Sequence, residues 1–420
     1  MEQLMDILKT GKTQFHVVES CKKKLIDSGF KQLDYNDNFD VIEGGKYFVC
    51  PFSSMMVAFC IGKNPDSLRI AAAHTDFPML KLKSNPEISK KGYFQVNVEP
   101  YGGLITQTWF DRPLGLAGKI VLRGESPFSP IVKLYDSQKP LFIIPNLAPH
   151  LKKDSKVQEV DVQKELVPIG ATLSFLGDYV SNGSVKKNFM VEQIAKDLDI
   201  NPNDILDYDL YLYIHAIPEY VGMCDELIAG ARIDNISSVS AIIEALCANE
   251  IGNCIAMGAF FDNEEIGSRS KQGADSLVLK EIIDKIRKKI TISNSFNMSV
   301  DVAHATHPNY IEKNDITNDI ILGNGLVLKT SASQKYVTDS EAGAVITALC
   351  QDNDIKMQRQ VNRSGMAGGQ TLGPIMAAYL PIKSVDIGIP MLAMHSACEL
   401  VHKNDYKELV KLISIYFKSR

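Results

Sequence analysis

Residues 256–267, which read AMGAFFDNEEIG, constrain the fold and chemistry of this chain more than any other segment. The apolar run predicts a buried strand, and it stops at two adjacent carboxylates, Glu264 and Glu265. Side chains at a strand end project in different directions, so one carboxylate can bind a metal while its neighbour carries protons. Charge patterning alone also allows a solvated turn. The rest of the chain must therefore decide between an active-site pair and a solvated turn.

Length and composition describe a globular protein of more than one domain. The chain has 420 residues, 45% apolar and 23% charged, and no apolar run approaches the roughly 18 residues that cross a bilayer. Its eight cysteines lack metal-ligand spacing, which favours reduced thiols, and the first 15 residues lack a secretory pattern. With a net charge of −5, we expect a cytoplasmic protein that binds neither nucleic acid nor membranes.

The order of the predicted elements indicates an interrupted α/β domain. Two helical stretches and paired strands precede residue 78, and a strand-rich region with Gly, Pro and Asn turns occupies residues 79–222. Alternating helix and strand patterns then return. We therefore predict a catalytic domain formed by residues 1–78 and 223–420, interrupted by a β-rich insertion at 79–222.

Five side chains that can bind a metal follow or flank predicted strand ends, where ligands gather in α/β sheets. They are His74, Asp234, Glu265, Asp301 and His395. Three of these residues also have an ordinary structural interpretation. His74 can be a histidine with satisfied hydrogen bonds, Asp234 can be a helix N-cap, and Asp301 can be a paired acid within an apolar strand. Taken together they suit two zinc-like ions sharing a bridging carboxylate, with an open position for water.

Glu264 adjoins a predicted ligand but is not needed as one, so it is the candidate general base. The glycine-rich segment NRSGMAGGQTLG lacks the established phosphate-binding patterns and is interpreted as substrate-pocket backbone. Lys329 ends the strand-like GLVLK, where a solvated lysine and a substrate-binding cation are both open alternatives.

The motifs AAAHTD, ARIDN, FFDNEEIGS, SVDVAHATHP, AMHSACE, TWFDRPLGLAG and IPNLAPHL resemble the M18 aspartyl aminopeptidase family of cocatalytic zinc exopeptidases, nearly end to end. The resemblance implies a zinc-exopeptidase-like mixed sheet flanked by helices, with a dimerisation domain inserted. It implies two divalent ions per subunit, most often zinc, with cobalt or manganese as alternatives. It also implies a homo-oligomer built from dimers, up to a dodecamer.

The same resemblance assigns roles residue by residue. His74 and Asp301 hold one metal, Glu265 and His395 hold the other, and Asp234 bridges them. Glu264 is the general base, and Asp76 orients His74. Substrate contacts are implied for His150, Lys329, Glu264, Asp301 and His395, and His150 is brought into a neighbouring subunit's site. From spacing alone, His150 also fits an ordinary turn histidine.

We therefore expect a metalloaminopeptidase that removes N-terminal residues, Asp or Glu above all, from peptides. One alternative is a related dinuclear hydrolase, either an M42-like peptidase or an N-acyl amino acid deacylase. The other is a non-catalytic scaffold of the same fold. The presence of all five ligands and the base argues against the scaffold.

Overall fold

The computed structural model describes residues 1–151, 159–248, 251–286, 292–366 and 368–419. The chain forms two compact units. The first contains residues 1–77, 218–394 and 398–420, and the second contains residues 78–217 and 395–397. The dimerisation role expected for the insertion at 79–222 stays a prediction.

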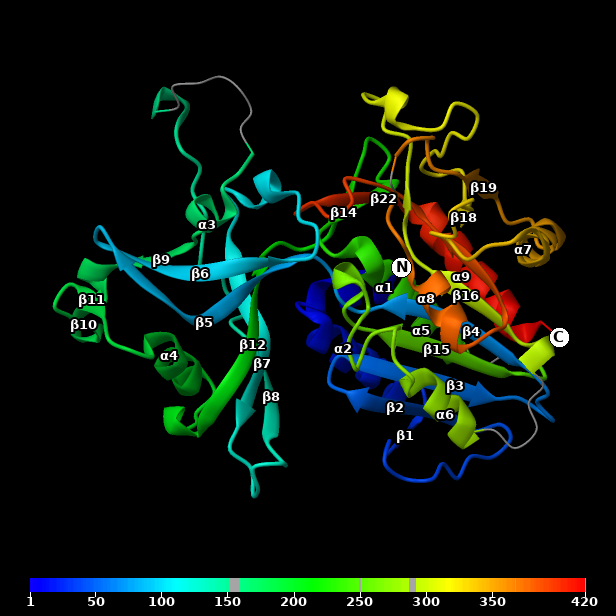
Figure 1. The fold of residues 1–420 in the computed structure, drawn as a ribbon, viewed down its shortest axis with the longest axis horizontal. Helices are drawn as coiled ribbons and strands as arrows, with labels where there is room; N and C mark the ends of the chain where they lie inside the picture. Colours follow the sequence, from blue (N-terminus) through cyan, green and yellow to red (C-terminus); the bar gives the residue numbers. More distant parts are fainter. Residues whose placement is uncertain (152–158, 249–250, 287–291, 367, 420) are drawn as a thin grey trace. The chain divides into compact units, whose positions relative to one another are not determined.

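A nine-stranded mixed sheet forms the centre of the first unit (Figure 1). In spatial order its strands are β1 (Lys31–Leu33), β2 (Lys46–Phe52), β3 (Met55–Ile61), β15 (Ile255–Phe261), β4 (Leu68–His74), β16 (Phe296–Val300), β20 (Lys383–Gly388), β18 (Leu326–Lys329) and β19 (Met357–Gln360). Strands β3, β15 and β4 are buried throughout, as their continuous apolar sequences predict for strands covered on both faces.

Helices cover both faces of this sheet. They are α1 (Glu2–Thr10), α2 (Gln14–Asp27), α5 (Ile233–Cys247), α6 (Val278–Ile286), α7 (Ser340–Asp352), α8 (Leu372–Tyr379) and α9 (Lys403–Lys418). Alternate residues of β15, including Met257, pack with α6 and α8 in one core cluster. Gly258 faces the other side, where a Cβ atom would lie 2.8 Å from Ile242 of α5. The absence of a side chain at Gly258 thus lets α5 pack directly on the sheet.

Four neighbouring strands at the middle of the sheet run in the same direction. β15 pairs in parallel with β4, β4 with β16, and β16 with β20. Phe261, the last residue of β15, pairs with His74, the last residue of β4. The carboxyl ends of these strands therefore meet at one edge of the sheet, as is usual for ligand sites in such folds.

A smaller five-stranded sheet completes the first unit. Its order is β13 (Glu219–Val221), β14 (Leu227–Gly230), β22 (Glu399–His402), β21 (Pro390–Leu392) and β17 (Ala303–His304). Strand β14 leads into α5, and β22 leads into α9. The small sheet thus connects the starts of two helices that pack on the large sheet.

The second unit is built on a six-stranded sheet. Its order is β8 (Ile131–Asp136), β7 (Leu114–Leu122), β12 (Ile205–Ile214), β5 (Met79–Lys90), β6 (Tyr93–Tyr101) and β9 (Ile169–Thr172). Two helices, α3 (Val162–Glu165) and α4 (Phe189–Asp197), and a small hairpin of β10 (Val180–Ser181) and β11 (Ser184–Val185) accompany this sheet. These elements agree with the strand-rich character predicted for this part of the chain.

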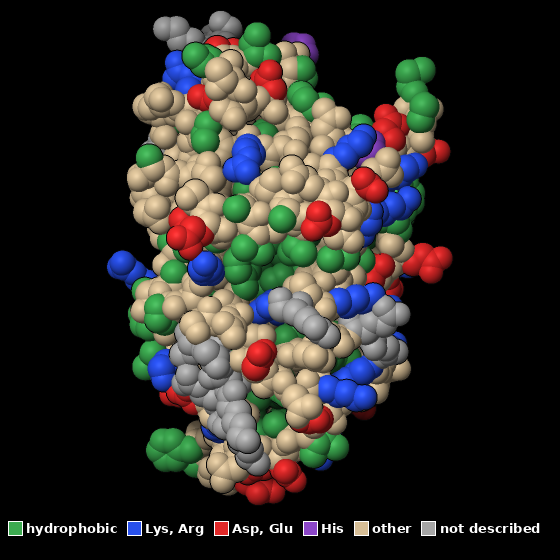
Figure 2. Space-filling model, turned by 90° about the vertical axis from the view of Figure 1, so that its right-hand side faces the viewer, with side chains coloured by type: hydrophobic (Ala, Val, Ile, Leu, Met, Phe, Trp, Pro, Cys, Tyr) green, Lys and Arg blue, Asp and Glu red, His purple; other side chains and the backbone are tan. Residues whose placement is uncertain are grey.

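The mixed sheet with helices on both faces confirms the predicted α/β class. Among the described residues, no helix combines the length and apolar character needed to span a membrane. On the face drawn in Figure 2, described Lys and Arg side chains are interspersed with Asp and Glu side chains. All eight cysteines are free thiols, as predicted.

Candidate active site

The candidate site lies at the shared carboxyl edge of β15, β4 and β16. His74 is the last residue of β4, Glu264 and Glu265 form a 3₁₀ turn three residues after β15, and Asp301 directly follows β16. Each apolar strand places its polar successor at the end of the sheet, because the side chains before it are held in the core. The strand order thus brings His74, Asp301 and the two glutamates to one edge of the sheet.

His74 is held by the backbone that follows it. The Nδ1 atom of His74 lies 3.0 Å from the carbonyl oxygen of Asp76 and 3.4 Å from an Asp76 carboxylate oxygen. A proton on Nδ1 satisfies this contact and leaves the lone pair of Nε2 for a ligand. That Nε2 atom lies 3.4 Å from Asp234 Oδ1 and 3.6 Å from Asp301 Oδ1. Burial favours the neutral ring, but the carboxylates of Asp234, Asp301 and Asp76 raise the pKa of His74 well above its ordinary value.

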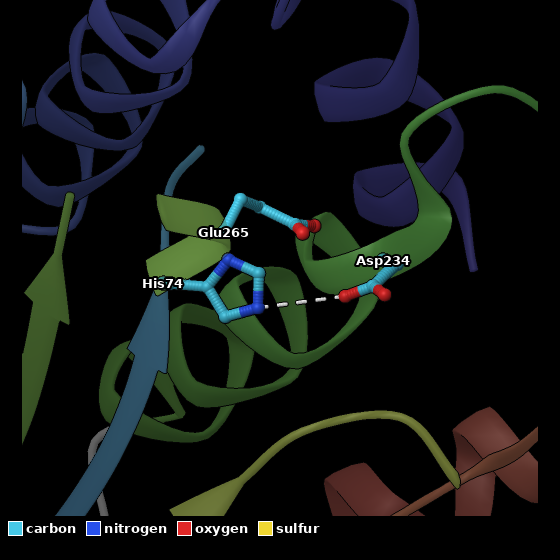
Figure 3. Close-up of side chains that lie close together, drawn as sticks. All are labelled: His74, Asp234 and Glu265. Atoms are coloured by element: carbon cyan, nitrogen blue, oxygen red, sulfur yellow. Dashed lines mark ion pairs between the residues drawn. The ribbon is translucent and has the colours of Figure 1, made fainter. Parts of the chain in front are cut away.

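His74, Asp234 and Glu265 form a group with the dimensions of a cation site. One ligand atom from each lies within 4.8 Å of the others. Figure 3 shows the three side chains pointing toward one another from β4, the start of α5 and the 3₁₀ turn. An imidazole with two carboxylates is a usual donor set for zinc, and Asp301 lies beside the same imidazole nitrogen. The residues therefore fit the predicted metal.

Asp234 is positioned by an irregular start to α5. Asp234 and Asn235 have non-helical backbone angles, so the regular helix begins after them. The backbone N–H of Asp234 donates to Glu399 Oε2 at 3.1 Å, and the Asn235 amide donates to the carbonyl of Val300 at 2.9 Å. These bonds tie Asp234 to β22 and to the end of β16.

Asp76 also fixes the turn that carries Glu264 and Glu265. Its two carboxylate oxygens accept the backbone N–H groups of Glu264 at 3.1 Å and Glu265 at 3.2 Å. The same carboxylate approaches the His74 ring, so one buried side chain contacts both halves of the site. Burial raises the pKa of Glu264 to about 8, with His74 opposing the rise and Asp301 and other carboxylates adding to it. A carboxyl group that titrates near neutrality is suited to proton transfer.

Lys329 is buried beside Asp301. Its side chain is 2% exposed, its Nζ atom donates to the carbonyl of Val302 at 2.8 Å, and it lies 3.5 Å from Asp301 Oδ2. The alternative of a solvated strand lysine is therefore wrong. Burial opposes the charge, yet Asp301 and other neighbouring groups raise the pKa of Lys329.

Two predicted site residues belong to the second unit. His395 has a positive φ of 66°, and its Nδ1 atom lies 2.8 Å from the carbonyl oxygen of Gly103. His150 lies in a short 3₁₀ turn, Pro149–Leu151, and is exposed. Their roles in metal and substrate binding stay predictions.

Two buried acids near these residues were missed in the sequence. Glu399 accepts the N–H of Asp234, and Asp386 pairs across strands with Lys329. Glu399 is the last residue of the AMHSACE motif, in which only His395 was predicted to be a ligand. Asp386 carries the same signal that singled out Asp301, a lone carboxylate inside an apolar strand, here SVDIGIP.

Comparison with known proteins identifies the family of this chain. The profile of the family described as Aminopeptidase I zinc metalloprotease (M18) matches residues 7–417. A Clostridium novyi protein named Probable M18 family aminopeptidase 2 is 37% identical over 428 residues, covering 99% of this chain and 98% of that protein.

Solved structures show the same fold over nearly the whole chain. The structure of Chaetomium thermophilum mApe1 has a TM-score of 0.85 and 29% identity, covering 99% of this chain and 96% of that chain. The S. cerevisiae mApe1 dodecamer, at 24% identity and with the same shares covered, has a TM-score of 0.84 and is similar in fold.

An α/β sheet with buried imidazole and carboxylate donors at its carboxyl edge is suited to hold a catalytic metal. The chain belongs to the M18 family and is a metal-dependent aminopeptidase. This family assignment favours the aminopeptidase over the M42-like peptidase, the deacylase and the scaffold.

Proposed function

We propose that this aminopeptidase removes N-terminal acidic residues from peptides at a site of two zinc ions, with Glu264 as general base. The observation that carries the proposal is the buried group of His74, Asp234 and Glu265, with Asp301 beside it and Glu264 adjacent. Asp234 is the proposed bridge, His74 and Asp301 the proposed ligands of one ion, and Glu265 and His395 those of the other. When bound, such ions lower the pKa of water and polarise the scissile carbonyl.

The chain's own groups account for the remaining steps. Glu264 takes a proton from the attacking water and delivers it to the leaving amine. Asp76 holds the Glu264 turn and the His74 ring through the bonds described above. His150 is proposed to donate a hydrogen bond to the developing oxyanion.

Acidic specificity is proposed to depend on Lys329. Its ammonium group lies next to the proposed ligand Asp301, so its charge is at the site. A substrate carboxylate entering a partly dry pocket needs a cationic partner to offset lost hydration.

The assembly and the location of the protein are proposed on more general grounds. We infer a homo-oligomer because a structural neighbour from S. cerevisiae is a dodecamer, and because the second unit is a separate strand-rich body. Eight free thiols fit the reducing cytoplasm.

The test is a panel of aminoacyl amides with acidic, neutral and basic side chains, assayed on zinc-loaded enzyme whose metal content is measured. We expect two ions per subunit and the highest kcat/KM for Asp and Glu substrates.

Lys329→Ala should lower kcat/KM for acidic substrates more than for neutral ones. The control is Lys81→Ala, at a lysine paired with Asp209 in the second unit, which should change neither value. Equal losses of kcat/KM on acidic and neutral substrates would refute recognition of the substrate carboxylate by Lys329. One ion per subunit would refute the dinuclear site.

A further inference from the structure

A second carboxylate, that of Asp386, lies on the strand next to the one that carries Lys329. Asp386 of β20 pairs in register with Ser299 of β16 and with Lys329 of β18. Directly paired residues of neighbouring strands project from the same face of a sheet. Ser299, Asp386 and Lys329 therefore form a buried polar row across three strands, and Gln360 of β19, paired with Lys329, extends it to a fourth.

The surrounding structure holds the Asp386 carboxylate rigidly. The backbone N–H of Val337 donates to Asp386 Oδ2 at 2.5 Å, and the Asp386 N–H donates to the Thr338 hydroxyl at 2.8 Å. Helix α8 packs a glycine directly on this group, because a Cβ atom at Gly373 would lie 2.7 Å from Oδ2 and 2.8 Å from Oδ1. Asp386 itself is fully buried. Burial raises the pKa of Asp386 and Lys329 opposes that rise, and the carboxyl group has no room to move toward α8.

The ammonium group of Lys329 forms its ion pair with Asp301, and Asp386 stands opposite Lys329 on the neighbouring strand. The ammonium group reaches Asp301 Oδ2 at 3.5 Å and the carbonyl of Val302 at 2.8 Å, and it lies 5.4 Å from the centre of the Tyr336 ring. Both carboxylates attract the lysine charge. One cation with two carboxylates leaves the trio with a net charge of −1, whereas a cation paired with Asp301 alone would leave a net charge of zero.

We propose that Asp386 is a positioning residue for the metal site, which holds the charge of Lys329 away from Asp301 and so keeps Asp301 an effective metal ligand. The proposal rests on the proposed role of Asp301. A carboxylate fully neutralised by an ammonium group attracts a divalent cation less strongly, and the effect is large where water is excluded. Partners that lie behind metal ligands commonly control metal affinity in this way.

The experiment measures zinc affinity by chelator competition, together with the thermal midpoint, for a set of variants. Asp386→Asn should weaken zinc binding about 10- to 100-fold, the usual range for a residue behind the ligands. The double variant Lys329→Met with Asp386→Asn should recover most of that loss, because the competing cation is gone. A defect of folding alone would not be repaired by removing a second buried group.

The control is Asp405→Asn. Asp405 is an equally buried carboxylate that accepts two backbone N–H groups, from Gly323 and Gly325, so it should affect the thermal midpoint without changing zinc affinity. If Asp386→Asn does not fold, Gly373→Ala tests the same group by pushing a methyl against the carboxylate, and it should also weaken zinc binding.

Three outcomes would overturn the proposal: zinc affinity unchanged in Asp386→Asn, unchanged affinity in Gly373→Ala, or a double variant as weak as the single one. Asp301→Asn separates this failure from a failure of the proposed site. If Asp301→Asn weakens zinc binding and Asp386→Asn does not, the ligand assignment stands and the positioning role falls. If Asp301→Asn has no effect, the ligand assignment itself is wrong.

Discussion

The two adjacent glutamates differ in what surrounds their carboxyl groups. Glu265 belongs to the group whose ligand atoms lie within 4.8 Å of one another. Glu264 belongs to the same turn, but burial and neighbouring carboxylates raise its pKa to about 8. The structure therefore separates a candidate ligand from a candidate proton carrier one residue apart.

Glu264→Gln should abolish most turnover while leaving zinc bound. The amide has nearly the same shape and still fits the turn, but it cannot accept a proton, and loss of general base catalysis typically costs about 10²- to 10⁴-fold in rate. The measurement is kcat with zinc content determined on the same sample. Glu19→Gln, on an exposed glutamate paired with Lys22, is the control and should retain full activity. Near wild-type kcat in Glu264→Gln would show that another group is the base.

The raised pKa of Glu264 also predicts a pH dependence in the metal-free protein. The carboxyl pKa rises from 4.5 to about 8 on folding, so between these pH values the folded state keeps a proton that the unfolded state releases. The free energy of unfolding contributed by Glu264 must therefore fall as pH rises through this window.

Glutamine cannot ionise, so metal-free Glu264→Gln should gain thermal stability relative to metal-free wild type as pH rises from 5 to 8. The comparison cancels the titration of groups that do not interact with Glu264. The readout is the difference in thermal midpoint between the two proteins at each pH. A difference that stays constant with pH would show that Glu264 does not titrate in this range.

At the scale of elements, the site depends on joining the end of β4 to the turn after β15. Strand pairing brings the two ends to the same level, and the Asp76 carboxylate then binds two consecutive N–H groups of that turn. A turn with N–H groups directed at an anion is an energetically favourable arrangement. Asp76 thus affects the ligand Glu265 and the base Glu264 together.

Asp76→Asn should weaken zinc binding about 10- to 100-fold, the range for partners behind ligands, because an amide can accept only one of the two N–H groups. Amide hydrogen exchange of Glu264–Ile266 should accelerate in the same variant. Asp405→Asn is matched in bonding and should accelerate exchange at Gly323 and Gly325 without altering zinc affinity. Unchanged protection of these amides from hydrogen exchange in Asp76→Asn would show that the Asp76 carboxylate does not hold the turn.

Much of the element structure was predictable because local patterns determine it. The apolar run before His74 predicts β4, and the amphipathic C-terminal segment predicts α9 over 403–418. The order of strands was not predictable: β15 inserts between β3 and β4, and no local pattern specifies that neighbour. The pairing of Asp386 with Lys329 was likewise not predictable, because sheet register defines it and sequence spacing does not.

At the scale of the whole molecule, an insertion separates residues that meet in one unit. His74 precedes the second unit in sequence and Asp234 follows it, yet their side chains lie 3.4 Å apart. Four of the proposed ligands, His74, Asp234, Glu265 and Asp301, thus belong to the first unit, whereas the proposed ligand His395 is grouped with the second. The second unit also carries His150, exposed in a turn, which connects catalysis to assembly if the proposed role in a neighbouring subunit holds.

His150→Ala should lower kcat about 10²- to 10³-fold, the usual effect of removing one oxyanion donor, with zinc content unchanged. Mixing this variant with inactive Glu264→Gln subunits, under conditions of subunit exchange, should restore part of the activity. A mixed pair can rebuild one complete site, with Glu264 from one subunit and His150 from the other. Exchange is followed independently with mass-tagged subunits.

The matched control mixes His150→Ala with a double variant, His150→Ala with Glu264→Gln. These mixtures exchange in the same way, but no subunit supplies His150, so activity should stay at the level of His150→Ala alone. Activity regained only in the first mixture would require the histidine and the base to come from different subunits. Proven exchange with no regain in the first mixture would place His150 in its own subunit's site or outside catalysis, because a residue acting across the interface must be replaceable by its copy in a partner.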